Sequence, residues 1–246
     1  MENHQQIKKA FGVGLEVVKK IEETQFENID QAAKLIARSF LDGKKFFVTG
    51  SGHSAMATED FYVRAGCLVF PIPILTSELT FIEHPHKSSL LERLDGYASI
   101  LAELYHIGQD DVILIVSNSG RNAYPVEMAI TAKEKGAKVI AITNLTASKN
   151  STSRAKSNKL LYEIADVVID NCGQPGDAAT WIEGIDTPML PTSTIANGFI
   201  VQALNIQVAI YIKSENVETP IFVCPNIMGS TEKNNEYFKK YTRLYK

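Results

Sequence analysis

The sequence predicts an α/β domain built on a five-stranded parallel sheet with strand order 2-1-3-4-5. Short apolar runs rich in β-branched residues alternate with segments of helical periodicity, which is typical of parallel sheets with helical crossovers. Glycines and prolines mark the boundaries between these segments. The 246 residues contain no long linker or internal repeat, so we expect a single domain over residues 1–246.

Two helices are predicted ahead of the sheet, in an N-terminal extension of about residues 1–43. The first is expected over roughly residues 5–24, from the apolar spacing of Ile7, Phe11, Leu15, Val18 and Ile21. Asn28 and Gln31 resemble a capping box for the second helix, which Gly43 can end. We expect both helices to pack across the sheet or against a partner subunit.

The first two strands are predicted at residues 45–49 and 67–70, with a helix from Ala55 to Gly66 between them. A long insertion follows, interrupted by three prolines: Pro71, Pro73 and Pro85. In this insertion Ser89 and Glu92 resemble a second capping box, for a helix that runs to about Ile107.

The remaining strands are expected at residues 112–116, 138–142 and 167–169. A helix over 123–135 follows the third strand and ends at Gly136, and residues 146–159 suit a short exposed helix and loop. The segment from Ile195 to Ile212 is apolar nearly all round, so it is either buried or an oligomer interface. Residues 221–224 suit an edge strand or a packed extension.

Composition excludes several classes of function. A mean hydropathy near zero, the lack of 18 consecutive apolar residues and an N-terminus without signal-peptide features predict a cytoplasmic protein with no membrane span. A net charge of -3 gives no electrostatic reason to expect nucleic acid. Three widely spaced cysteines suit reduced thiols and indicate neither a disulfide framework nor a zinc site.

Two polar turns carry the strongest functional signal. Gly50-Ser-Gly-His-Ser54 follows the first strand, and Ser117-Asn-Ser-Gly-Arg-Asn122 follows the third. Asn122 can cap the next helix, and Pro125 fits its first turn. Hydroxyls and backbone N–H groups at a helix N-terminus suit an anion. With strand order 2-1-3-4-5 the winding reverses between the first and third strands, so both turns are expected at one crevice.

These turns resemble the two phosphosugar-binding turns of SIS (sugar isomerase) domains. Ala165-Asp166 before the fifth strand and Ser193-Thr194 at the start of the late helix are also similar to that family, and the resemblance covers roughly residues 30–215. It implies a three-layer α/β/α sandwich with a flavodoxin-like sheet. It also implies a phosphorylated sugar as ligand and a homodimer or tetramer with sites near the subunit contacts.

The resemblance also implies roles for individual residues. Ser54, Ser117 and Ser119 would bind the phosphate, while four residues would line the sugar: Ser51, Gly52, His53 and Asn118. Gly120 would allow close approach of the backbone. The family often has Thr where this chain has Asn122, and Arg121 could add positive charge. Ser193 and Thr194 complete the set of expected substrate-binding residues.

A catalytic base is harder to assign. Aldose–ketose isomerisation needs a base that moves a proton between adjacent carbons, often Glu or His. Glu59 and Asp60 are placed like the acidic pair of phosphoheptose isomerases, but those enzymes also carry a His in the late helix, and residues 195–212 contain none. Glu83, His84 and His86 in the insertion are therefore candidates beside Glu59, on a loop that could close over the sugar.

Other functions remain open from the sequence. Residues 50–55 also fit the dinucleotide pattern G-x-G-x-x-A, but no acidic residue closes the second strand to hold a ribose. His84 and His86 could be a metal pair, yet further ligands are missing, so we expect neither metal nor cofactor. The leading hypothesis is a sugar-phosphate isomerase. A non-catalytic sensor, or a lyase or etherase of amino-sugar phosphates that uses Glu83, are the alternatives.

Overall fold

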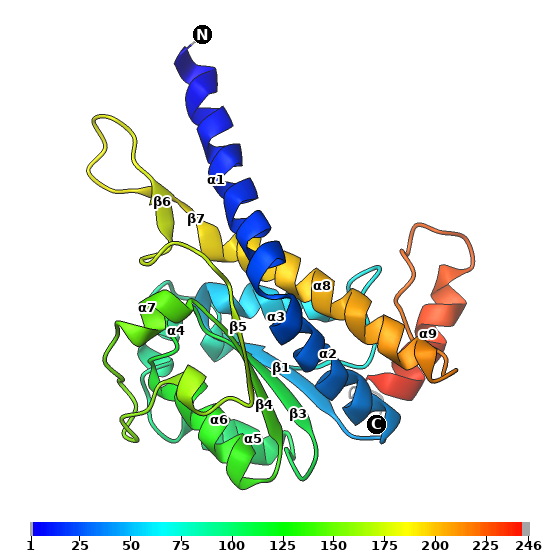
Figure 1. The fold of residues 1–246 in the computed structure, drawn as a ribbon. Coiled ribbons are helices and arrows are strands. Elements are labelled where there is room, and N and C mark those ends of the chain that lie inside the picture. Colours follow the sequence, from blue (N-terminus) through cyan, green and yellow to red (C-terminus); the bar gives the residue numbers. More distant parts are fainter. Residues whose placement is uncertain (1, 243–246) are drawn as a thin grey trace.

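A five-stranded parallel sheet lies at the centre of the computed structural model, which describes residues 2–242 (Figure 1). Its order is β2-β1-β3-β4-β5, as the sequence predicts. The strands are β1 (Phe46–Gly50), β2 (Ile72–Ile74), β3 (Val112–Val116), β4 (Lys138–Thr143) and β5 (Val167–Asp170). Residue 1 and residues 243–246 of the expected domain lie outside the described residues.

Helices cover both faces of the sheet, which confirms the three-layer sandwich. Because side chains alternate along a strand, Val48 and Leu114 face one layer while Phe47 and Ile113 face the other. The first layer consists of α2 (Phe26–Leu41), α3 (Ala55–Phe61) and α8 (Thr192–Ser214). The second consists of α5 (Tyr97–Leu104) and α6 (Ala123–Glu134). Strands β1, β3 and β4 are buried between the layers, as their continuous apolar runs predict.

Helix α1 (Glu2–Thr24) projects beyond the body of the molecule (Figure 1). Its outer part exposes Ile7, Phe11 and Leu15 by 55%, 69% and 68%. The predicted start of the second helix is wrong, because α2 begins at Phe26 and encloses Asn28. The side chain of Gln25, the residue between the helices, accepts hydrogen bonds from Asn28 Nδ2 and from the backbone of Asp170, both at 3.0 Å. A contact with β5 therefore sets this boundary.

Helix α8 is long and apolar enough by composition to cross a membrane, with a mean hydropathy of 1.5 over its most apolar window. In this structure it packs along α2 and over the sheet, where its buried residues include Ile200, Leu204 and Val208. The opposite side exposes Phe199, Ile206 and Ile210. One side of this segment is therefore buried, as one of the two expectations has it, and the other side is exposed.

The predicted second strand is wrong. Residues 67–70 are buried outside the sheet, and Leu68 forms an antiparallel bridge with Ile221, so residues 221–224 are a packed extension. The edge strand is β2 instead, which pairs only with β1 and contains Pro73. An edge strand tolerates proline because its outer N–H groups have no ladder partner.

Two predicted helices are shorter in the structure. Helix α3 ends at Phe61 rather than at Gly66, because Tyr62 is extended and Val63 adopts a φ of 53°. The helix predicted from Ser89 to Ile107 is split into α4 (Lys87–Leu91) and α5, with Gly96 at a φ of 87° just before α5. Glu92 therefore lies in the connection between α4 and α5, and its side chain does not form the capping box predicted with Ser89.

Some elements were not predicted from the sequence. A two-stranded antiparallel sheet, β6 (Ala178–Thr180) with β7 (Met189–Pro191), precedes α8, and α9 (Ser230–Tyr241) lies near the C-terminus. These elements depend on contacts with distant segments, such as the packing of Phe222 and Tyr237 on Val69. The expected short helix after β4 is present as α7 (Leu145–Lys149).

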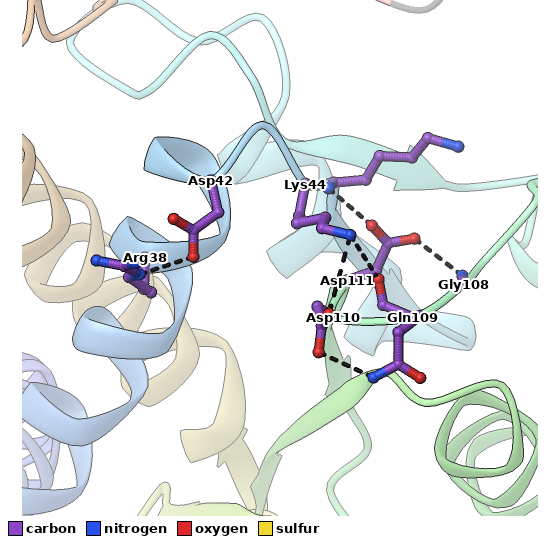
Figure 2. Close-up of polar contacts among 8 residues, drawn as sticks. Arg38, Asp42, Lys44, Gly108, Gln109, Asp110 and Asp111 are labelled. Atoms are coloured by element: carbon purple, nitrogen blue, oxygen red, sulfur yellow. Dashed lines mark hydrogen bonds and ion pairs between the residues drawn. The ribbon is translucent and has the colours of Figure 1, made fainter.

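Asp111 holds together the segments that lead into β1 and β3, at the end of the sheet where these two strands begin (Figure 2). Its buried carboxylate accepts hydrogen bonds from the backbone N–H groups of Lys45 and Gly108, both at 2.9 Å. Its neighbour Asp110 points outward, where it accepts from Gln109 Nε2 at 2.9 Å and lies 3.9 Å from Lys44 Nζ. Asp111 therefore aligns β1 with β3 before either strand begins.

We expect Asp111→Asn to lower the free energy of unfolding by about 1–3 kcal/mol, because an amide NH₂ would face one of two buried N–H donors. Urea denaturation measures the change. Asp110→Asn is the matched control, and it should change stability by less than about 0.5 kcal/mol because its side chain is exposed. Equal effects of the two substitutions would contradict the role given to Asp111.

Candidate functional site

The first polar turn leaves β1 at Gly50 and forms a 3-10 turn over Gly52–Ser54 before α3 begins. Gly52 has a φ of 59°, and a Cβ there would lie 3.3 Å from the ring of Phe81. The Phe81 ring also lies 4.6 Å, centroid to centroid, from His53. The insertion therefore reaches the first turn through an aromatic side chain.

The second turn, residues 117–122, is held by the side chain of Ser117 and by the backbone of a distant loop. Gly120 N donates to Ser117 Oγ at 3.2 Å, and Gly120 O accepts from Leu161 N at 2.8 Å. Gly120 has a φ of 58°, and a Cβ there would lie only 2.8 Å from Ser148 Oγ. Glycine is therefore required at this position, for both conformation and space.

Asn122 occupies the N-cap position of α6, but its side chain does not cap the helix as predicted. Its Nδ2 donates instead to Glu92 at 2.7 Å, so a tertiary partner replaces the local bond. The start of α6 is fixed by Tyr124, whose backbone N–H donates to Glu92 O at 2.9 Å and whose hydroxyl lies 2.6 Å from Thr49 Oγ1. Burial raises the pKa of Tyr124 above its ordinary value, so the phenol stays protonated.

Glu92 joins the two turns. One carboxylate oxygen accepts from Ser51 Oγ at 2.7 Å and the other accepts from Asn122 Nδ2 at 2.7 Å. The first and second turns therefore lie on either side of one carboxylate, in the region where the strand order predicts a crevice. Sequence reasoning missed Glu92 because its spacing from Ser89 suggested a local capping role. The only feature of the sequence that could have indicated a role at the site is the position of Glu92 in the insertion between the first and third strands.

A network of asparagines lies on the other side of the second turn. Asn171 Nδ2 donates to Asn118 Oδ1 at 2.9 Å and to Asn197 Oδ1 at 3.3 Å. Asn144 donates to Gly173 O at 2.6 Å. The side-chain oxygen of Asn118, expected to line the sugar, is thus directed toward the ends of β4 and β5. The network ties the second turn to α8.

Helix α3 and the start of α8 border a small cleft of about 40 Å³. It brings together three predicted residues from distant segments, namely His53, Ser193 and Thr194. Ser193 Oγ donates to Asp177 at 2.9 Å, and Ser193 N donates to the same carboxylate at 2.7 Å. Asp60 lines this cleft and forms an ion pair with Arg64 at 2.9 Å, whereas its neighbour Glu59 is exposed.

The catalytic candidates of the insertion have their partners within the insertion itself. Glu83 is exposed and forms an ion pair with Lys87 at 2.5 Å. His84 is also exposed, and its Nδ1 accepts from His86 N at 3.2 Å. The structure does not bring Glu59 together with these residues. Within residues 2–242 no group of three or more His, Cys, Asp or Glu side chains is arranged to hold a metal ion.

Solved structures share this fold. The phosphoheptose isomerase GmhA from Neisseria gonorrhoeae superposes with a TM-score of 0.57 at 18% identity, over 83% of this chain and 97% of that chain. A phosphoheptose isomerase from Francisella tularensis gives 0.54 at 17% identity, over 85% and 98%. The sugar isomerase domain of an RpiR transcription factor from Sphaerobacter thermophilus gives 0.50 at 17% identity, over 96% and 97%.

Curated relatives match along nearly the whole chain. A UPF0309 protein of Thermoanaerobacter pseudethanolicus is 41% identical over 93% of this chain and 94% of its own length. Another from Halalkalibacterium halodurans is 40% identical over 92% and 94%. The sequence profile of the SIS domain matches residues 11–144, which include both polar turns and Glu92. The chain therefore belongs to the SIS domain family, within its UPF0309 group.

Proposed function

We propose that the crevice between the two polar turns binds a phosphorylated sugar. The supporting observation is the Glu92 carboxylate, which contacts Ser51 of the first turn and Asn122 of the second. One small ligand can therefore touch both turns at once. Membership of the SIS family supports a sugar phosphate as that ligand.

The phosphate is assigned to the serine hydroxyls and the N-terminus of α6. Within residues 2–242 the hydroxyls of Ser54 and Ser119 have no hydrogen-bond partner, so both can donate to a phosphate oxygen. Ser117 Oγ accepts from Gly120 N, which leaves its own proton to donate. The positive end of the α6 dipole adds to this attraction.

The reaction we propose is aldose–ketose isomerisation. A carboxylate removes the proton from the hydroxyl-bearing carbon next to the carbonyl, which gives an enediolate, and the hydroxyl proton moves to the former carbonyl oxygen. A proton that can exchange with solvent at the carboxylate is then added to the former carbonyl carbon. Glu92 is the best placed base, because it already lies in the crevice between Ser51 and Asn122. Glu83 stays a candidate that requires the insertion to move, because Phe81, and not Glu83, contacts the first turn.

A sensor that binds the ligand without turnover is the second candidate. The absence of histidine in α8 and the exposure of Glu59, Glu83 and His84 favour it. Such a protein would respond to the same sugar phosphate through its oligomer. Isomerase and sensor therefore differ in turnover alone.

We further propose that the protein is a cytoplasmic homodimer or tetramer formed through α1 and α8. The exposed apolar side chains of α1 continue onto α8 through Phe26. A groove of about 550 Å³ between α2 and α8, lined by Phe26, Ala203 and Ile206 among others, lies in the same region. A second copy of the chain can bury these exposed apolar side chains.

Phosphorylated sugars should raise the thermal midpoint of the protein, whereas the corresponding free sugars should not. At a ligand concentration 100 times its Kd, binding adds about 2.7 kcal/mol, which for a chain of this size is a shift of about 5–10 °C. Ser119→Ala should reduce the shift because it removes one donor to the phosphate. A panel of aldose and ketose phosphates that produces no shift would refute the proposal.

Glu92→Gln should lower kcat by about 10²–10⁴-fold while sugar-phosphate binding persists, because the amide keeps the size of the side chain but cannot accept a proton. Exchange of substrate hydrogen with D₂O, followed by NMR, measures the proton transfer directly. Glu83→Gln is the comparison: if it alone abolishes exchange, the base lies in the insertion. No exchange in the wild-type protein, despite binding, would support the sensor.

Phe11→Glu should weaken the oligomer by at least about 30-fold, the loss expected from a central apolar contact worth about 2 kcal/mol. Sedimentation equilibrium measures the dissociation constant. Ile100→Glu is a matched control, since Ile100 is 58% exposed on α5, in the opposite layer. A wild-type protein that is monomeric at micromolar concentration would exclude the proposed assembly.

A further inference from the structure

Three arginines gather around the contact between Asn122 and Glu92. Arg121 follows Gly120 in the second turn, and Arg93 follows Glu92. The loop after α7 brings Arg154 beside them, because Arg154 N donates to Arg121 O at 2.8 Å and Arg154 Nη1 donates to Asn122 Oδ1 at 3.3 Å. Segments far apart in the sequence thus place three cations at one end of the crevice.

These cations are not neutralised by ion pairs. Elsewhere in the described chain, Arg38 pairs with Asp42 at 2.7 Å and Arg64 pairs with Asp60 at 2.9 Å. Within residues 2–242, none of the three crevice arginines forms an ion pair with a carboxylate. The Nε of Arg121 is buried and has no hydrogen-bond partner there. The three positive charges of the group therefore outnumber the single carboxylate, Glu92, that lies beside them.

The arginines also affect one another. The charge of Arg121 lowers the pKa of the Arg154 guanidinium, and burial and the charge of Arg93 lower it further, against the opposing charge of Glu92. Holding like charges together costs free energy unless an anion accompanies them. Guanidinium groups bind carboxylates and phosphates through paired, charge-assisted hydrogen bonds. The group is thus suited to an acidic ligand.

A single phosphate does not account for this group. The serine hydroxyls and the α6 N-terminus already provide a site for one phosphate, as proposed above. Asn122 contacts Glu92 through Nδ2 and Arg154 through Oδ1, so only this side chain separates the carboxylate from the arginine. A sugar whose reacting carbons lie at Glu92 would present a neighbouring substituent to Arg154.

We propose that the ligand carries two acidic groups: a phosphate bound by the serine turns, and a second phosphate or a carboxylate bound by Arg93, Arg121 and Arg154. This proposal rests on the proposed sugar-phosphate site and narrows its substrate class to sugar bisphosphates and phosphorylated sugar acids. Glu92 then lies between the two anchoring points, where the chemistry of the sugar chain takes place.

Isothermal titration calorimetry with four probes tests the proposal: glucose 6-phosphate, fructose 1,6-bisphosphate, 6-phosphogluconate and gluconate. At least one of the doubly acidic phosphates should bind about tenfold or more tightly than glucose 6-phosphate, the gain expected from a charge-assisted hydrogen bond. Preference for the bisphosphate identifies a second phosphate, and preference for 6-phosphogluconate identifies a carboxylate. Gluconate, without phosphate, should bind weakest.

Arg154→Gln should lower the affinity for the doubly acidic ligands by more than it lowers the affinity for glucose 6-phosphate, and so reduce the preference for two acidic groups. Lys156→Gln is the matched control, because Lys156 lies in the same loop but pairs with Asp95 at 3.4 Å, so its loss should leave the preference intact. Equal affinity of the wild type for singly and doubly acidic sugars, or equal loss of both in Arg154→Gln, would overturn the inference and leave the sugar-phosphate site standing. Failure to bind any phosphorylated sugar would refute both this inference and the proposed sugar-phosphate site.

Discussion

The pairing of β1 with β3 is the constraint on which the site depends. Gly50 lies opposite Val116 in the parallel register, so Ser51 and Ser117 leave the sheet at the same level. The two strands are neighbours in the sheet although β2 and the whole insertion separate them in the chain. Adjacent parallel strands whose chains leave in opposite directions open a crevice at their carboxyl ends. Without this register Glu92 could not reach Ser51 and Asn122 together.

The second turn, residues 117–122, is held in place by hydrogen bonds on the side away from Glu92. The asparagines that follow β3, β4 and β5 are all hydrogen-bonded: the fully buried Asn171 donates to Asn118 and Asn197, and Asn144 donates to Gly173 O. Tyr124 anchors α6 to β1 through Thr49. Such support lets the donors of the second turn be oriented before a ligand arrives, which reduces the reorganisation that binding requires. The asparagines and Tyr124 thus stabilise the fold and also orient the second turn for a ligand.

Local patterns in the sequence were sufficient for the central strands and the two turns, because continuous apolar runs and Gly/Ser turns reflect burial and backbone geometry directly. The strand order was predicted from the fold class, and it holds although the second strand was misplaced. Local patterns failed where a distant partner decides the outcome. The apolar run at 67–70 looks like a strand, but Leu68 pairs with Ile221 in the C-terminal part of the chain. Asn122 has the sequence position of a helix cap, but its side chain donates a hydrogen bond to Glu92 instead of capping α6. Glu92 and Arg154 carry no local signature, since only the folded chain places them at the crevice.

The loop between α7 and β5 is joined to the second turn by its main chain. Arg154 donates to the carbonyl of Arg121, and Leu161 donates to that of Gly120. These bonds do not depend on side-chain identity, so substitutions on the outer side of the loop leave them in place. Lengthening or shortening the stretch between Arg154 and Leu161 would displace one of these two bonds to the turn. This peripheral segment can therefore vary in composition but not in length.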